Sequence, residues 1–191
     1  MKFHTMPVIR SHEKRENSLI NMSSRDKPNI MITGTPGTGK TSLCEQLARE
    51  TGFRHINVGD WVKEKSLHSG WDDDFECFVL DDDKVCDALE ELVEEGGCIV
   101  DHHGCDMFPE RWFDLVIVLQ TDNSTLFDRL QRRGYSQKKI QENVECEIMM
   151  VVAEEARESY KEEIVKLLPS NTSEDLERNL QQLVDWIRAN T

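Results

Sequence analysis

The eight residues from Gly34 to Thr41, with the sequence Gly-Thr-Pro-Gly-Thr-Gly-Lys-Thr, have the spacing of a phosphate-binding loop. Glycines at such positions let backbone N–H groups turn inward around phosphate oxygens. A lysine here can reach the terminal phosphates, and the following hydroxyl can bind Mg²⁺. The alternative is a glycine-rich turn that only caps a helix. The candidate phosphate-binding residues are Gly37, Gly39, Lys40, Thr41 and Ser42.

Asp101 directly follows the apolar run Cys98-Ile99-Val100. An acid at the carboxyl end of a buried parallel strand lies on the ligand-binding edge of the sheet. There it can hold Mg²⁺ through a water molecule, together with Thr41. The alternative is an aspartate that caps the following turn, but the phosphate loop upstream favours the metal.

His102 and His103 come next in the chain, followed by Cys105. A zinc site would need further cysteines or histidines at ligand spacing, and this stretch offers none that is convincing. Two interpretations of His103 stay open. It is either a turn residue with its own hydrogen bonds or a group beside the terminal phosphate that positions water or an acceptor.

Three arginines, Arg129, Arg132 and Arg133, fall within five positions of an otherwise acidic chain. Arg129 and Arg133 are four residues apart, so on a helix they share one face. Guanidinium groups make two-pronged contacts with phosphate and stabilise charge on a phosphoryl group in transfer. The alternative is a solvated helix end, where cations are favoured in any case.

Short apolar runs that predict strands alternate with stretches of helical spacing. The predicted strands cover residues 29–33, 55–58, 98–100, 115–119 and 164–168, and the predicted helices cover 40–50, 82–95, 122–132, 138–157 and 173–189. Alternation of this kind is typical of a parallel sheet that is covered by helices on both faces. The sequence therefore predicts an α/β fold with the candidate residues at the carboxyl edge of the sheet.

The chain has 191 residues, with 23 basic and 37 acidic ones, so its net charge is −14. Residues 1–27 hold six basic and three acidic residues and are predicted to be a flexible extension, while residues 28–191 form one domain with 17 basic and 34 acidic residues. This acid excess argues against a broad nucleic-acid-coating surface. Its meaning stays open between simple solubility and attraction of a basic partner.

Three further features concern location. No apolar run reaches the roughly 20 residues of a membrane-spanning helix, and the first residues lack a secretory signal. The six cysteines are scattered without a C-x-x-C pair, which suits free thiols in a reducing compartment. We expect a soluble intracellular protein.

Seven blocks, in the same order, resemble the adenylate kinase isoenzyme 6 family of P-loop nucleoside monophosphate kinases. They cover residues 34–41, 57–60, 72–77, 100–106, 108–112, 133–135 and 168–171. The resemblance implies a P-loop NTPase three-layer fold with a central parallel sheet, helices on both faces, a monophosphate-binding region at 57–80 and a short lid at 132–142. Gly37, Gly39, Lys40, Thr41 and Ser42 match the family's ATP-binding loop. Arg133 matches its lid arginine, and Asp101 with His103 matches its D-x-H element, which is linked to ATP hydrolysis.

The resemblance also implies an activity. An ATP-dependent enzyme would use Mg²⁺ to transfer the γ-phosphoryl group to AMP or a related monophosphate, and it would also hydrolyse ATP. Implied as well are a role in maturation of the small ribosomal subunit and its 18S rRNA, a basic protein of that subunit as partner, and a location in nucleus and cytoplasm. The alternative is an ATP-switched assembly factor whose main activity is hydrolysis coupled to partner release.

The chain departs from ordinary monophosphate kinases at two places. Lys63 stands where many of them have an arginine after Gly-Asp. The Asp-Gly-x-Pro-Arg element is absent after Asp101, where His-His-Gly-Cys follows, so a phosphate-clamping arginine is lost. These changes bear on the rate of transfer more than on nucleotide binding.

Overall fold

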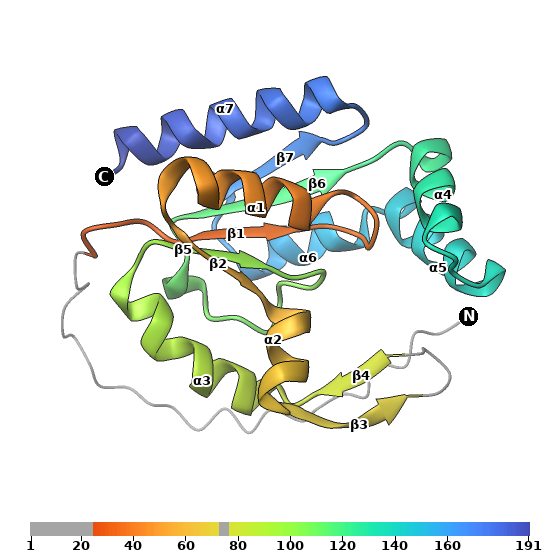
Figure 1. Cartoon of the computed structure of the whole chain (residues 1–191), viewed down its shortest axis with the longest axis horizontal. Helices are drawn as coiled ribbons and strands as arrows, with labels where there is room; N and C mark the ends of the chain where they lie inside the picture. The colour runs from red at the N-terminus through yellow and green to blue at the C-terminus, as the bar shows by residue number, and fades with distance from the viewer. Residues whose placement is uncertain (1–24, 73–76) are drawn as a thin grey trace.

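The computed structural model describes residues 25–72 and 77–191, except for the side chains of residues 71–80 (Figure 1). The strands are β1 (Ile30–Thr33), β2 (Arg54–Asn57), β3 (His68–Asp72), β4 (Cys77–Leu80), β5 (Cys98–Asp101), β6 (Leu115–Gln120) and β7 (Val165–Pro169). The α-helices are α1 (Lys40–Thr51), α2 (Val58–Lys65), α3 (Asp82–Glu95), α4 (Asn123–Arg132), α5 (Gln137–Ile148), α6 (Val151–Ser159) and α7 (Ser173–Ala189). Two short 3₁₀ turns cover Glu110–Trp112 and Glu162–Ile164.

Five strands form one parallel sheet in the order β2-β5-β1-β6-β7. The pairing of β1 with β5 sets Ile32 opposite Asp101, so the phosphate loop after β1 and the acid that ends β5 meet at one edge of the sheet. The α/β three-layer fold predicted from the sequence is confirmed.

Side chains of the central strand alternate between two cores. Ile30 and Ile32 pack with α1 and α7, whereas Met31 packs with α3 and α6 on the opposite face. Figure 1 shows these two helix layers on either side of the sheet. All three side chains are fully buried, as expected for a strand covered on both faces.

Asn29 fixes the start of the central strands. Its side-chain amide donates to the carbonyl groups of Val93 (2.6 Å) and Trp112 (3.0 Å), and its side-chain oxygen accepts from the Cys98 N–H (3.0 Å). One buried polar side chain therefore joins the end of α3, the turn before β6 and the first residue of β5. Since all three backbone groups gain a partner, their burial costs little.

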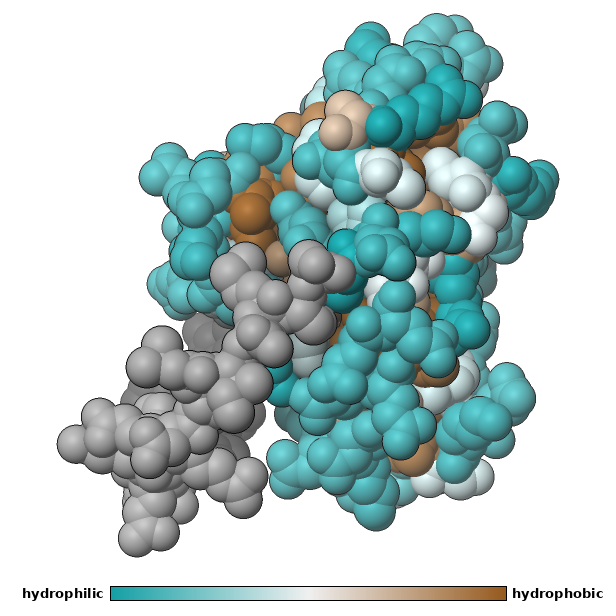
Figure 2. Space-filling view, turned by 90° about the vertical axis from the view of Figure 1, so that its left-hand side faces the viewer, coloured by the Kyte–Doolittle hydropathy of each residue, from teal (hydrophilic) through white to brown (hydrophobic). Residues whose placement is uncertain are grey.

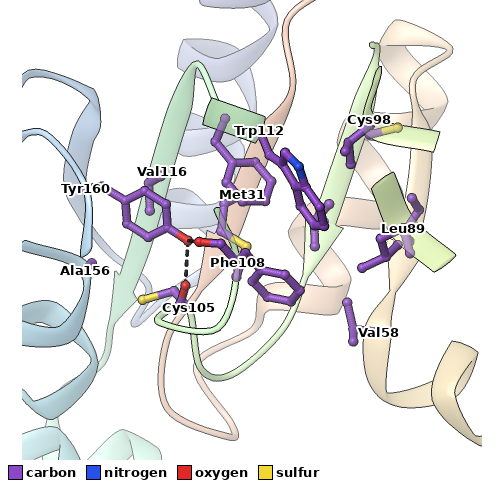
Figure 3. Close-up of a cluster of buried hydrophobic side chains, with 14 of the residues drawn as sticks. Met31, Val58, Leu89, Cys98, Cys105, Phe108, Trp112, Val116, Ala156 and Tyr160 are labelled. Carbon is purple, nitrogen blue, oxygen red and sulfur yellow. Dashed lines mark hydrogen bonds between the residues drawn. The ribbon is translucent and has the colours of Figure 1, made fainter. Parts of the chain in front are cut away.

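Aromatic packing below the sheet holds the loop that follows β5. Phe108, Trp112 and Phe113 pack in tilted and edge-to-face arrangements, with ring centroids 6.1–6.5 Å apart, and Tyr160 packs edge to face on Phe113. The Tyr160 hydroxyl donates to the Cys105 carbonyl at 2.5 Å, the dashed line in Figure 3. The end of α6 therefore anchors the loop that carries His102 and His103.

The prediction of one continuous helix over residues 138–157 is wrong. Helix α5 ends at Ile148, and α6 begins at Val151 after Met150 adopts a left-handed conformation with φ of 54°. Apolar residues continue through the break although α5 packs on α4 and α6 packs in the core with Met31, so periodicity does not reveal the turn.

Sequence reasoning also missed the elements between β2 and α3. The strand predicted at 55–58 ends at Asn57, because the Asn57 side chain accepts from the Asp60 N–H (3.0 Å) and caps α2. The antiparallel pair β3–β4 was not predicted, because His68–Asp72 has no apolar run. The boundaries of the monophosphate-binding region and of the lid stay predictions.

Residues 1–24 of the predicted extension lie outside the described residues. Arg25, near its end, contacts the domain through the Asp114 carboxylate (3.0 Å) and the Arg111 carbonyl (3.2 Å). Contacts with the domain therefore begin before Pro28. Among the described helices, none has the length and apolar character needed to cross a membrane.

Candidate active site

A cavity of about 240 Å³ opens at the carboxyl edge of the sheet. Arg129 and Arg132 do not line this cavity, whereas eight other residues singled out in the sequence do: Gly37, Gly39, Lys40, Thr41, Ser42, Asp101, His103 and Arg133. Asn57, Gly59, His102 and Tyr135 also line it. The site therefore combines segments that lie up to about 100 residues apart in the chain.

Two glycines of the loop adopt backbone conformations that other residues rarely accept. Gly37 has φ of 99° and Gly39 has φ of 96°. A Cβ atom on Gly37 would lie 2.8 Å from Leu126 Cδ1, too close for any real contact. The loop thus needs glycine here for its backbone turn and for its close packing on α4.

Arg129 and Ser170 brace the loop from below. The Arg129 guanidinium donates to the carbonyl groups of Ser170 (2.8 Å), Asn171 (2.8 Å) and Gly37 (3.4 Å). The Ser170 hydroxyl donates to the Thr38 carbonyl at 2.6 Å. The two arginines that share a helix face therefore have different roles, because the Arg129 guanidinium donates its hydrogen bonds to backbone carbonyl groups.

Arg133 remains available for a ligand. It follows the last turn of α4 and its side chain is exposed. Within the described part of the chain, that side chain has no hydrogen-bonded or ion-paired partner. Arg133 and Lys40 line the same cavity, and the Arg133 charge helps to lower the pKa of Lys40. Two cations beside one cavity favour an anionic ligand.

Lys40 lies at the start of α1 and points back over the loop. Its ammonium group donates to the carbonyl groups of Gly34 (2.7 Å) and Thr35 (3.2 Å). Burial lowers the pKa of Lys40 to about 8, even though Asp101 nearby opposes the shift. A phosphate in the cavity would supply the negative charge that the buried ammonium lacks.

Asp101 collects donors from two neighbouring elements. Its Oδ2 atom accepts from the Thr41 hydroxyl (2.7 Å) and from the Asn57 side-chain amide (2.8 Å). Burial opposes ionisation of Asp101, but His55, Thr41 and the Lys40 charge outweigh it and lower the pKa of the carboxyl. Asp101 is therefore ionised at neutral pH. A carboxylate beside a hydroxyl is a set of hard oxygen donors, which fits Mg²⁺.

His103 faces the cavity from the loop after β5. Its ring lies 4.3 Å from the ring of His102, which is buried and held against the Gly104 carbonyl at 2.9 Å. Burial, then His102 and Lys40, lower the pKa of His103, so that its imidazole is neutral at pH 7. A neutral imidazole can accept a hydrogen bond from water or a hydroxyl group.

Two residues near the site were given no role by the sequence. Glu147 of α5 accepts from the Thr35 hydroxyl and, at 2.8 Å, from the Thr121 N–H, so it ties α5 to the loop. Asn57 both caps α2 and donates to Asp101. Glu147 stands among many acids of an amphipathic helix, and nothing in its spacing marks it. For Asn57, the only indication of a role in the sequence is that it begins one of the seven blocks that resemble the family.

A parallel five-stranded sheet with a glycine-rich loop between β1 and α1 defines a P-loop kinase fold, and solved structures agree. Shikimate kinase from Acinetobacter baumannii, in complex with shikimate, superposes with a TM-score of 0.61 over 87% of this chain and 96% of that one, at 16% identity. A gluconokinase from Sinorhizobium meliloti gives a TM-score of 0.51 at 15% identity, over 87% and 99% of the two chains. At these identities the likeness shows the fold alone.

Sequence relatives define the family. A family model described as an AAA domain matches residues 30–150. An adenylate kinase isoenzyme 6 homolog of Dictyostelium discoideum is 58% identical over 164 residues, which cover 86% of this chain and 94% of that protein. The homolog of Caenorhabditis elegans is 51% identical over 85% and 90% of the two chains. The chain belongs to the adenylate kinase isoenzyme 6 family of ATP-dependent nucleotide kinases, as its seven sequence blocks predict.

The lowered pKa of Lys40 predicts how binding of a nucleoside triphosphate depends on pH. Below about pH 8 the free site already carries the charged ammonium, whereas above it Lys40 must take up a proton in order to bind phosphate. Affinity for a non-hydrolysable ATP analogue should therefore be constant up to pH 8 and then fall, by at most about tenfold per pH unit. Calorimetric titrations at about pH 7.5 and about pH 9.5 measure this difference.

The control is Lys40→Arg, whose guanidinium stays charged over this range and whose affinity should not depend on pH. Equal affinity of the unaltered chain at the two pH values would contradict the role of Lys40 as a proton-dependent phosphate ligand.

Proposed function

We propose that the protein transfers the γ-phosphoryl group of ATP to AMP or a related nucleoside monophosphate, and that it also hydrolyses ATP. The observation that carries the proposal is the single cavity that gathers the phosphate loop, Asp101, His103 and Arg133. Phosphoryl transfer needs positioning and charge stabilisation more than covalent chemistry, and these residue types provide both. Names of the homologues support the choice of adenine nucleotides.

Each residue has a defined task in the proposed reaction. The inward-facing backbone N–H groups of the loop and the Lys40 ammonium bind the β- and γ-phosphates. Arg133 approaches from the lid side and neutralises charge that develops on the phosphoryl oxygens. Thr41 and Asp101 would hold Mg²⁺, which would supply positive charge next to the phosphates when bound. In ATP hydrolysis, neutral His103 accepts a hydrogen bond from the attacking water.

Product analysis tests the proposal. Incubation with ATP, AMP and Mg²⁺ should form two ADP molecules per AMP consumed, on top of the ADP that ATP alone yields by hydrolysis. Lys40→Ala should lower both rates by at least about 100-fold because it removes a charge that acts on the transferred group. His103→Gly should lower hydrolysis more than transfer, since water needs orientation that a bound acceptor already has.

Arg132→Ala is the matched control, because Arg132 is the exposed neighbour of Arg133 and does not line the cavity. It should leave both rates within about twofold of the unaltered enzyme. Absence of ADP beyond the ATP-only reaction would refute transfer to AMP. Equal rates in the unaltered, Lys40→Ala and His103→Gly proteins would refute the assignment of the site.

A second candidate function is that of an ATP-switched assembly factor for the small ribosomal subunit, present in nucleus and cytoplasm. One observation favours a basic protein as its partner: α3 holds seven acidic residues and one lysine. Among the acids, Asp83, Asp87, Glu91, Glu94 and Glu95 are exposed. The sequence is also dense in acidic residues from Asp72 to Asp83, a stretch that lies partly outside the described residues. Figure 2 shows one face of the molecule that is mainly hydrophilic, so charge complementarity suits a partner better than apolar docking.

Charge reversal on α3 tests this second function. Glu91→Lys with Glu94→Lys should weaken retention of a basic small-subunit ribosomal protein by about tenfold or more, and ATP should change retention by the unaltered chain. The matched control reverses Glu177 and Asp185 on α7, which lies across the molecule from α3 (Figure 1). If ATP does not change retention of the ribosomal protein by the unaltered chain, the result counts against the switch. Equal retention by the α3 and α7 variants would refute α3 as the contact.

A further inference from the structure

A second group of metal-ligand side chains lies beside Asp101, under the first turns of α1. The Cys44 thiol, the His55 ring and the Asp101 carboxylate each place one ligand atom within 4.8 Å of the other two. They come from α1, β2 and β5, so the group exists only in the folded chain. Cys44 and His55 have no task in the proposed phosphoryl transfer.

Strand register explains why the three side chains meet. Asn57 pairs with Asp101 across β2 and β5, and both point toward α1. His55 lies two residues before Asn57 and therefore points to the same face. Cys44 lies one helical turn after Lys40 on the inner side of α1 and is fully buried.

The His55 ring supplies the second observation. Its Nε2 atom is buried and lies 3.5 Å from Asp101 Oδ2, and among the described residues it makes no hydrogen bond of good geometry. Because this contact leaves a buried ring nitrogen poorly satisfied, a metal ion bound by both side chains would improve its contacts. The His55 side chain retains 18% exposure and lies on β2, the edge strand of the sheet, so the group lies close to the surface.

The donor set selects the kind of ion. Sulfur, imidazole nitrogen and one carboxylate oxygen suit Zn²⁺ and Co²⁺, whereas Mg²⁺ prefers oxygen donors alone. In a tetrahedral zinc site, ligand atoms lie about 3.3–3.8 Å apart. The group has to contract by about 1 Å from its present spread, within the reach of small side-chain rotations.

We propose that Cys44, His55 and Asp101 form a binding site for a soft divalent cation of the Zn²⁺ class, which competes with Mg²⁺ and nucleotide for Asp101. On binding, the Cys44 thiol releases its proton to solvent, and a water molecule completes the tetrahedron. The competition rests on the proposed function of Asp101, whereas the binding itself does not.

Cobalt spectroscopy of the untagged full chain tests the site. Titration with Co²⁺ alone should produce a thiolate-to-cobalt charge-transfer band and tetrahedral visible bands at one ion per chain, and Zn²⁺ should abolish both. Cys44→Ala should remove the charge-transfer band, and His55→Gln should weaken Co²⁺ binding by about tenfold or more. Thermal unfolding of each variant checks that it is folded.

Cys146→Ala is the matched control, because Cys146 is a half-buried free cysteine of α5 outside the group. It should keep the full spectrum. Absence of a charge-transfer band in the unaltered chain, or the same band and affinity in folded Cys44→Ala, would overturn the proposal.

Addition of Mg²⁺ with ATP to the cobalt-loaded chain tests the competition. The charge-transfer band should weaken, because Asp101 then binds Mg²⁺ in the nucleotide site and no longer binds Co²⁺. A band that persists while ATP binds would overturn the sharing of Asp101, and failure of ATP to bind at all would instead contradict the proposed function.

Discussion

The register between β1 and β5 places the phosphate loop beside Asp101, and the rest of the site depends on it. Ile32 pairs with Asp101, and Thr41 at the start of α1 then reaches the carboxylate at 2.7 Å. A shift of one residue would turn Asp101 toward the opposite core, where its charge would have no partner. The register is held by complete burial of Ile30, Met31 and Ile32 and by Asn29, which bonds to the first residue of β5.

The loop itself cannot hold its shape, because glycines have the largest conformational freedom to lose. Distant segments supply the rigidity: Arg129 and Ser170 bond to its carbonyl groups, and Glu147 accepts from Thr35. Arg129, which bonds to the loop, and Arg133, which lines the cavity, lie at the same end of α4. Tyr160 fixes the loop after β5 in a similar way. Binding and catalysis thus rest on contacts between elements far apart in sequence.

The sequence predicted the parts of the molecule whose structure depends on residues close together in the chain. Apolar runs marked four of the five sheet strands closely, and the glycine-lysine pattern marked the loop. Contacts that arise only in three dimensions could not be predicted. Examples are the role of Glu147, the meeting of Cys44 with His55, and the left-handed turn at Met150 that divides the predicted helix at 138–157. The sequence pattern places Arg129 and Arg133 on one helix face, yet only the fold shows that Arg129 bonds to the backbone and Arg133 lines the cavity.

The central claim is that Asp101 and Thr41 make nucleotide binding depend on Mg²⁺. Its most direct test measures the affinity for ATP with and without Mg²⁺ in the unaltered chain and in Asp101→Asn, with Asp106→Asn, an exposed acid nearby, as control. We expect Asp101→Asn to retain metal-free affinity within about twofold and to lose the effect of Mg²⁺, while the control keeps it. An unchanged response to Mg²⁺ in Asp101→Asn would contradict the account.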